Sequence, residues 1–495
     1  MPHPEIPWEK IAVFDINHGG LSIADRLFKN GIAVAAFDVY RKKSPENLDA
    51  YADSCAFPVS ADLNDLTKDY DIVCLPVHLS PENEFAKKAA ELGIPTMTHH
   101  EMVGRLLKTN PEITDRYLIE ITGVRGKTST SVLLARMLSY KNRVLLHTSE
   151  GLTIWKNGEY DWIEHGISIT PAYIPDLVQT AFDRKIQPEI FIFEVSLGFT
   201  GAQDIGILTD TQPDYKIAGG TISSTGAKMN MISRSKQNST FVINYRDLEI
   251  FENYIREDQE QIVFDDSGAA VEENTPTDIY LNISIGKDGE SAAEIESSRT
   301  GIFFRAELGD GYDIDSYKTA MAAAVAAALE LDIPEAAIAD VISNFSGVKG
   351  RMREYVKNDR LIMDNSNSGL TVSAAAAALE YMQDKYLDKK SADYDIDRAI
   401  TAVIGADDKT VCEGLDPREV EEWIFKYGKD IQNLILVGAE IEEYMKARSG
   451  GENHDEDEDL FRRAVYAENY KDGFQKALEL SEENGIIISA VKCFR

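Results

Sequence analysis

Cysteine and positive charge are both scarce in this 495-residue sequence. The four cysteines, at positions 55, 74, 412 and 493, stand far apart and form no C-x-x-C pair. This spacing argues against a disulfide framework or a zinc knuckle, and it favours reduced thiols in an intracellular protein. Lys and Arg number 51 against 84 Asp and Glu, a formal net charge of -33. So acidic a chain argues against nucleic acid or an anionic membrane as a partner.

Long apolar runs are also missing. The longest, TAMAAAVAAALEL, is shorter than the ~20 residues that a membrane span needs. The first residues, MPHPEIPWEK, lack the apolar core of a secretion signal. We therefore expect a cytoplasmic protein without a membrane partner, either a monomer or a homodimer. At roughly 150 residues per domain, the length suggests about three domains.

Residues 1–108 have the pattern of a small Rossmann-like domain. Apolar runs such as IAVFDI, AVAAFDVY and DIVCLPV alternate with amphipathic stretches, which predicts a parallel sheet with helical crossovers. The final run, IPTMTHH, is interpreted as a strand, which would point His99 and His100 to opposite faces. Gly19 and Gly20 follow the first strand, but a complete G-x-G-x-x-G is absent. They indicate a tight turn rather than a dinucleotide site.

Two more α/β segments follow, at residues 109–348 and 349–495. The first contains the apolar runs YLIEITG, EIFIFEVS and DIGILTD, and its helix SYKTAMAAAVAAALEL is predicted to close the central domain. In the second, RLIMD, AITAVIG and NLILVGA alternate with helical patterns, and the acidic run at 453–460 is interpreted as a solvated loop. The sequence therefore predicts an α/β protein of three domains.

The stretch ITGVRGKTST, residues 121–130, has the form of a phosphate-binding loop between a strand and a helix. Its glycines allow backbone N–H groups to turn towards an anion, its lysine reaches terminal phosphates, and its first threonine can place a hydroxyl on Mg²⁺. We predict that it binds the phosphates of a nucleotide, which the family resemblance described below implies to be ATP. The predicted contact residues are Gly123, Val124, Arg125, Gly126, Lys127, Thr128 and Ser129.

Four charged residues further along are candidates for the same site. Glu194 ends an apolar strand. It is either a ligand of Mg²⁺ or a carboxylate that caps a helix or forms an ion pair. Lys228 opens a helix, where a lysine is most often solvated. Arg351 either brings a cation onto a phosphate or forms a salt bridge. Asp364, at the end of RLIMD, either faces the same cleft or caps the next helix.

The order of these motifs resembles that of the Mur ligase superfamily: a small α/β domain, ITGVRGKTST, EVS, AK, an alanine-rich helix, GRM, and a strand ending in Asp. The resemblance spans the whole chain. It implies an N-terminal Rossmann-like domain, a central P-loop ATP-binding domain and a C-terminal Rossmann-like domain. It also implies that ATP activates a carboxylate as an acyl phosphate, which a second nucleophile then attacks.

The resemblance further implies the role of individual residues. Lys127, Glu194 and Arg351 correspond to catalytic positions of the family. Thr128 and Glu194 correspond to its magnesium ligands, and Arg351 and Asp364 to ATP-binding residues. Lys228 matches a lysine that many members carry as a carbamate, supporting a second Mg²⁺.

Two departures separate this chain from ordinary peptide-forming ligases. Tyr215 in PDYKIAGG takes the place of a histidine, which puts the second metal site in doubt, and DNSNSGL replaces the usual third-domain motif for an incoming amino acid. Strings such as FDINHGGLSIA, EVSLGFTGAQDIGILTD and AVKCFR resemble the methanogen branch that includes coenzyme F430 synthetase. That resemblance implies a nickel tetrapyrrole substrate, seco-F430 acid, whose propionate is activated and closed into a carbocyclic ring. The nickel belongs to the substrate and not to the protein.

A basic cluster after AVAAFDVY is a candidate for binding the substrate's carboxylates, with a solvated loop as the alternative. We assign to substrate binding the residues Arg41, Lys42, Lys43, Asn17, His18 and Tyr215. Two other functions stay open at this point. One is an amide-forming ligase of the pseudomurein precursor or polyglutamate type. The other is a nucleotide-responsive binding protein that has lost catalysis, which the departure at Tyr215 would favour.

Overall fold

The computed structural model describes residues 4–41, 43–268, 276–286, 290–387, 398–411, 414–448 and 463–494. The chain divides into two compact units. One comprises Met1–Leu308 and Lys318–Ser343, and the other comprises Gly309–Tyr317 and Asn344–Arg495. None of the helices in the described ranges has the length and apolar character needed to cross a bilayer. Cys55 and Cys74 are free thiols, and Cys412 lies outside the described residues.

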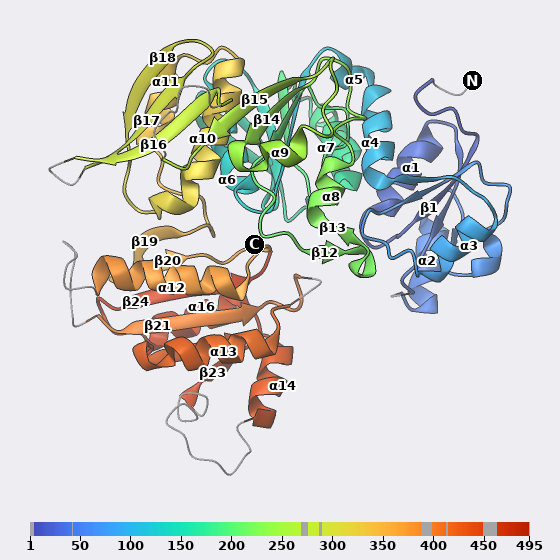
Figure 1. Ribbon diagram of the computed structural model, residues 1–495. Helices are drawn as coiled ribbons and strands as arrows, with labels where there is room; N and C mark the ends of the chain where they lie inside the picture. Colours follow the sequence, from blue (N-terminus) through green and yellow to red (C-terminus); the bar gives the residue numbers. More distant parts are fainter. Residues whose placement is uncertain are drawn as a thin grey trace. The chain divides into compact units, whose positions relative to one another are not determined.

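The first unit begins with a five-stranded parallel sheet in the order β3-β2-β1-β4-β5 (Figure 1, blue). Apolar side chains fill both faces of this sheet, as expected where helices cover both sides. Ile23 and Leu27 of α1 and Leu106 of α4 pack on one face, and Phe85 of α3 packs on the other. The elements are β1 (Lys10–Phe14), α1 (Gly20–Lys29), β2 (Ala33–Phe37), α2 (Pro45–Ser54), β3 (Val59–Ser60), β4 (Ile72–Leu75), α3 (Glu84–Glu91), β5 (Thr96–Thr98) and α4 (His99–Lys108).

The predicted strand over IPTMTHH is wrong in its last two residues. The strand ends at Thr98, and His99 and His100 begin helix α4. The Thr98 hydroxyl accepts a hydrogen bond from the backbone N–H of Glu101 at 3.2 Å, which caps the helix. Both histidines are buried, and burial lowers the pKa of His99 to about 3 and that of His100 to about 4. They are neutral core residues.

The same unit contains an eleven-stranded sheet in the order β18-β17-β16-β15-β14-β11-β6-β10-β7-β8-β9. Strand β6 lies near its centre, between β10 and β11 and parallel to both. The strands are β6 (Tyr117–Thr122), β7 (Val144–Thr148), β8 (Gly151–Lys156), β9 (Glu159–His165), β10 (Ile190–Glu194), β11 (Ile205–Leu208), β14 (Thr240–Asn244), β15 (Glu260–Asp265), β16 (Ile279–Ile285), β17 (Ser291–Ser297) and β18 (Ile302–Glu307). A small antiparallel pair, β12 (Lys216–Ile217) and β13 (Ile222–Ser223), stands apart from this sheet.

Helices connect and cover these strands. Helix α6 follows β6 directly, so the stretch between them is a short strand-to-helix loop. The helices of this part are α5 (Pro111–Thr114), α6 (Lys127–Ser139), α7 (Ile174–Asp183), α8 (Ser224–Met229), α9 (Leu248–Phe251), α10 (Ile314–Glu330) and α11 (Glu335–Ser343). Helix α10 belongs to this unit from Lys318 onwards. The predicted alanine-rich helix corresponds to α10.

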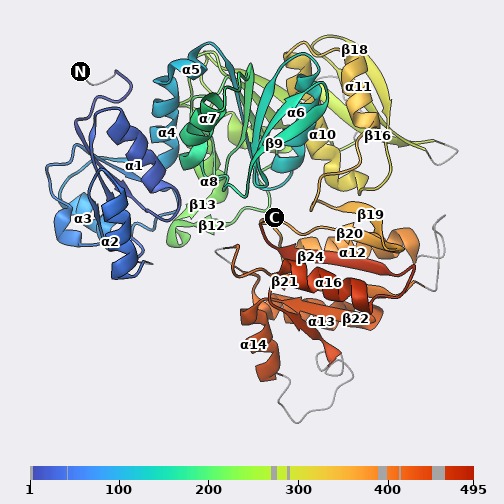
Figure 2. The same cartoon turned by 180° about the vertical axis from the view of Figure 1, so that it is seen from behind.

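The second unit is built on a six-stranded sheet in the order β19-β20-β24-β21-β22-β23, parallel except for β19. Helices α12 and α13 lie in front of this sheet in Figure 1, and α16 lies in front of it in the reverse view of Figure 2. The elements are β19 (Arg353–Lys357), β20 (Arg360–Asp364), α12 (Val372–Tyr386), β21 (Ile400–Ala406), α13 (Pro417–Tyr427), β22 (Asn433–Val437), α14 (Ala439–Arg448), β23 (Val465–Ala467), α16 (Tyr470–Leu480) and β24 (Ile486–Lys492). The acidic run at 453–460 lies outside the described residues.

Candidate active site

The loop between β6 and α6 has the backbone of an anion-binding turn. Gly123 and Gly126 adopt φ angles of 148° and 79°, which are sterically unfavourable for residues other than glycine. A Cβ atom at Gly123 would lie 2.0 Å from Thr209 Oγ1, so the loop also needs glycine for space. The Lys127 ammonium donates to the carbonyl oxygens of Gly123 at 3.1 Å and Val124 at 3.4 Å. The loop lies at the carboxyl end of a parallel strand, where such sheets bind ligands.

Thr128 and Glu194 lie against each other beside this loop. The Thr128 hydroxyl donates to Glu194 Oε2 at 2.9 Å, and the backbone N–H of Ser149 approaches the same oxygen at 3.4 Å. Both side chains are buried, and they meet because β10 and β6 are neighbours that pair Glu194 with Ile121. A hydroxyl and a carboxylate are the oxygen ligands that Mg²⁺ prefers. The residues therefore fit the predicted magnesium site.

Asp210 is part of the loop structure, although the sequence analysis did not select it. Its Oδ1 accepts hydrogen bonds from the backbone N–H of Val124 at 3.0 Å and of Arg125 at 2.9 Å. Burial raises the pKa of Asp210, while these two hydrogen bonds oppose the shift. It follows strand β11, on the other side of β6 from Glu194. Its position at the end of the apolar run DIGILTD, like that of Glu194, could have identified it.

Lys228 is buried, with 1% of its surface exposed, so the solvated alternative is wrong. Its ammonium donates to the Ser224 carbonyl at 3.3 Å and lies 5.4 Å from the centre of the Tyr215 ring. Burial and, to a lesser degree, the positive charge of Lys127 lower its pKa to about 8, while nearby aspartates oppose the shift. Tyr215, 47% exposed, therefore lies between the lysine ammonium and the surface.

Arg351 and Asp364 belong to the second unit, where Asp364 stabilises the turn before Arg351. Asp364 accepts hydrogen bonds from the backbone N–H of Gly350 at 3.0 Å and of Ser366 at 3.3 Å. Thr371 caps helix α12, so the interpretation of Asp364 as its cap is wrong. The Arg351 guanidinium donates to the Gly350 carbonyl at 3.2 Å.

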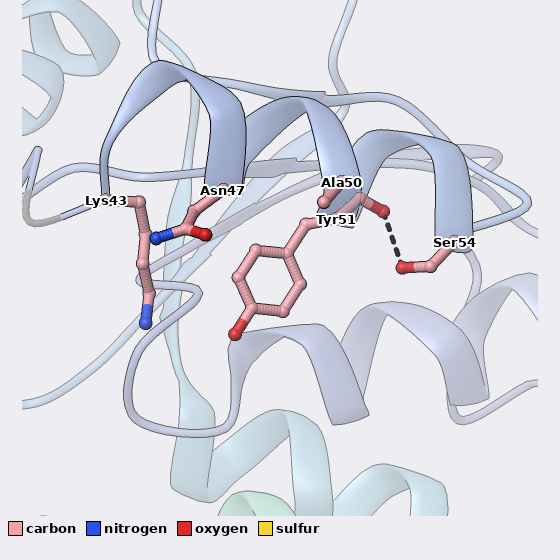
Figure 3. A pocket seen from close by; sticks show the side chains of 5 residues that line it. All are labelled: Lys43, Asn47, Ala50, Tyr51 and Ser54. Atoms are coloured by element: carbon pink, nitrogen blue, oxygen red, sulfur yellow. Dashed lines mark hydrogen bonds between the residues drawn. The ribbon is translucent and has the colours of Figure 1, made fainter.

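Four of the residues assigned to substrate binding, Asn17, His18, Arg41 and Lys43, lie at the carboxyl edge of the first sheet, whereas Tyr215 lies between β11 and β12. Asn17 donates to Asp38 at 3.2 Å, and Arg41 forms an ion pair with Glu84 at 2.6 Å. Lys43 lies 5.5 Å from the centre of the Tyr51 ring, and both line a hollow of about 290 Å³ (Figure 3). Lys42 lies outside the described residues.

His18 is held by a carboxylate that the sequence analysis did not single out. Its Nδ1 lies 2.7 Å from Asp15 Oδ2, and Nε2 of His78 lies 3.8 Å from the same oxygen. The spacing between Asp15 and His78 in the sequence gave no sign of this cluster.

The chain is similar to proteins of one family along its whole length. It is 37% identical over 503 aligned residues to the coenzyme F(430) synthetase of Methanosarcina acetivorans, covering 98% of this chain and 99% of the relative. The chain belongs to the coenzyme F430 synthetase family. The model of that family's C-terminal domain, "Coenzyme F430 synthetase CfbE, C-terminal domain", matches residues 354–493. The coenzyme F(430) synthetase of Methanocaldococcus jannaschii is 24% identical, with 91% of this chain and 96% of that one covered.

A solved structure supports the fold. The crystal structure of MurF from Acinetobacter baumannii superimposes with a TM-score of 0.53 at 11% identity, covering 90% of this chain and 95% of that one. The resemblance to the Mur ligases, the α/β fold class and the prediction of a ligase of the F430 synthetase family are therefore confirmed. The three domain boundaries and the roles of single residues stay predictions.

Proposed function

We propose that the protein is an ATP-dependent ligase that converts seco-F430 acid, a nickel tetrapyrrole, into coenzyme F430. A propionate carboxylate of the substrate is activated as an acyl phosphate, a carbocyclic ring closes, and ADP and phosphate leave. The observation that carries this proposal is the full-length similarity to the F430 synthetase of Methanosarcina acetivorans. The loop geometry is consistent with it.

The loop and the residues beside it are suited to hold ATP. Gly123 to Ser129 would surround the phosphates, with Lys127 exchanging its contacts to two loop carbonyls for phosphate oxygens. Thr128 and Glu194 would hold Mg²⁺, which when bound neutralises charge on the phosphates. Lys228 as a carbamate would add a ligand for a second Mg²⁺. Arg351 and Asp364 stay the predicted nucleotide-binding residues of the second unit.

The reaction proceeds in two balanced steps. A carboxylate oxygen of the substrate attacks the γ-phosphorus, and the bond to the bridging oxygen breaks so that ADP leaves. A carbon of the same substrate then loses a proton and attacks the acyl carbon, and phosphate leaves with the electron pair of the carbon–oxygen bond. Lys127 stabilises the charge that develops in the first step. The substitution of DNSNSGL for an amino-acid-binding motif agrees with an attacking group inside the substrate.

The test is ADP release from ATP and seco-F430 acid, with and without added amino acids. We expect release with the tetrapyrrole alone, and we expect Lys127→Ala to abolish it. Lys156→Ala is the matched control, because that lysine is exposed at the end of β8. Near-normal turnover by Lys127→Ala, or release that requires an added amino acid, would contradict the proposal.

A further inference from the structure

Three side chains from two parts of the chain meet at the carboxyl edge of the first sheet. Asp15 follows β1, His18 lies in the next turn, and His78 follows β4. Asp15 is fully buried (0% exposed) and has a φ angle of 73°, a conformation that residues other than glycine rarely adopt. Such strained residues cluster at functional sites. Its Oδ1 accepts hydrogen bonds from the backbone N–H of Asn17 at 3.0 Å and of His18 at 3.3 Å.

The other oxygen of Asp15 determines how His18 is oriented. Oδ2 lies 2.7 Å from His18 Nδ1, so the proton of the neutral imidazole sits on Nδ1 and Nε2 is left as the basic nitrogen. Burial raises the pKa of Asp15, but its interactions with His18 and His99 and the hydrogen bond from the Asn17 N–H together outweigh burial, so the pKa lies below its ordinary value. The carboxylate therefore stays ionised and can stabilise an imidazolium.

Aromatic rings fix the position of the imidazole further. His18 contacts Tyr40 and His78 edge to face, with ring centroids 5.9 and 5.3 Å apart. Tyr40 and His78 are themselves parallel, with centroids 6.4 Å apart. With 31% of its side chain exposed, His18 is accessible to a substrate, whereas Asp15 is not.

A short segment connects this cluster to the region of the magnesium ligands. The carbonyl of His18 accepts a hydrogen bond from the Thr170 hydroxyl at 3.5 Å. The carbonyl of Ile169 accepts one from the backbone N–H of Ser196 at 3.1 Å. Ser196 stands two residues after Glu194. The segment of Ile169 and Thr170 therefore contacts both the turn of His18 and the residues that follow strand β10.

Ring closure needs a group that accepts a proton. When a carbon bearing hydrogen attacks an acyl phosphate, the electrons of its C–H bond end in the new C–C bond, and phosphate leaves with the electrons of the C–O bond. One proton is released for each ring formed. We propose that His18 Nε2 is the general base that takes this proton, with Asp15 as its positioning residue. The inference rests on the proposed function, and the protonated imidazole returns its proton to phosphate or water.

The decisive test separates activation from ring closure. Hydroxylamine traps an acyl phosphate as a hydroxamate, so both products can be measured with seco-F430 acid and ATP. General bases contribute ~10²–10⁴-fold to a proton transfer, and we expect His18→Gln to lower the ratio of closed product to hydroxamate by that factor. His165→Gln, an exposed histidine in β9, is the matched control and should leave the ratio unchanged. An unchanged ratio in His18→Gln would overturn the inference.

Two further variants exclude a merely structural role. Added imidazole should restore ring closure to His18→Gly, since a free base can enter the space left by the side chain. Asp15→Asn should lower the ratio as well, while its melting temperature and hydroxamate formation show whether the protein is folded. If added imidazole does not restore ring closure in a folded His18→Gly, the role of His18 as the general base is contradicted.

The ligand atoms of Asp15, His18 and His78 lie within 4.8 Å of one another, a spacing that a divalent transition metal could also use. Metal analysis of the purified protein tests this alternative. The wild type could hold a stoichiometric metal that His18→Gln lacks and that ring closure requires. That result would overturn the role of His18 as the general base and indicate a metal site. If the wild type forms no hydroxamate and no closed product, the proposed function itself fails, which is a different result from normal closure in His18→Gln.

Discussion

The burial of Lys228 leads to a quantitative prediction for its reaction with CO₂. Only the neutral amine reacts, and burial lowers the pKa from 10.5 to about 8. At a pH of about 7.5 the neutral fraction therefore rises from about 0.1% to about a quarter, roughly 240-fold. Lysines shift their pKa in this way when they are buried, and this prepares them for covalent chemistry. We predict that Lys228 carries a carbamate in the active protein.

The assay uses ¹³C-labelled CO₂ and NMR. A carbamate carbon signal should appear in the wild type and in Lys216→Ala, the control with an exposed lysine in the same PDYKIAGG stretch. Lys228→Ala should lack the signal and should lose about 100-fold or more in ADP release, since a metal ligand contributes several kcal/mol to such a step. A short carboxylic acid such as acetate should restore part of that loss. The reasoning is refuted if saturating CO₂ gives no carbamate on Lys228, or if removing CO₂ leaves the rate of the wild type unchanged.

Three other substitutions test separate parts of the structure. Glu120, buried in β6, accepts a hydrogen bond from the Thr200 N–H at 2.7 Å, and burial raises its pKa from 4.5 to about 7. The folded state then binds more protons than the unfolded state, so the free energy of unfolding should fall by about 3 kcal/mol as the pH rises from 4.5 to 7. In urea unfolding, Glu120→Gln should show a weaker dependence of this free energy on pH. Equal dependence in the wild type and the variant would contradict the prediction. Thr128→Val should raise the Mg²⁺ concentration for half-maximal ADP release about tenfold or more. An unchanged concentration would show that the Thr128 hydroxyl is not a ligand of the metal. Asp364→Ala leaves the buried Gly350 N–H without its acceptor and should destabilise the second unit by about 1–3 kcal/mol in urea unfolding, whereas no loss would show that water replaces the carboxylate.

The sequence predicted those parts of the fold and site that depend on local pattern. Strand β6, the glycine loop and helix α6 follow each other within twenty-three residues, Tyr117 to Ser139, so their arrangement is contained in one stretch. Glu194 could be placed next to Thr128 because parallel strands present their carboxyl ends at one edge of the sheet. No further information is needed to predict that these two side chains lie close together.

Contacts between distant residues could not be predicted in the same way. Asp15 and His78 are brought together only by the order of strands β1 and β4 in the sheet, which one sequence does not reveal. The burial of Lys228 depends equally on tertiary packing. The error at His99 was avoidable, because Thr98 and Glu101 have the spacing of a capping box and already indicate the start of a helix.

The carboxylate of Asp210, which follows β11, already occupies two N–H groups of the loop that we propose for phosphate binding. A nucleotide that uses the N–H groups of Val124 and Arg125 has to displace this carboxylate from hydrogen bonds of 3.0 and 2.9 Å, and the Val124 N–H also donates to the Asp210 carbonyl at 3.1 Å. The free energy of ATP binding at these donors is then reduced by the free energy of the hydrogen bonds that Asp210 gives up. If the loop binds phosphates as proposed, departure of ADP returns these donors to Asp210, and the nucleotide-free loop keeps both hydrogen bonds.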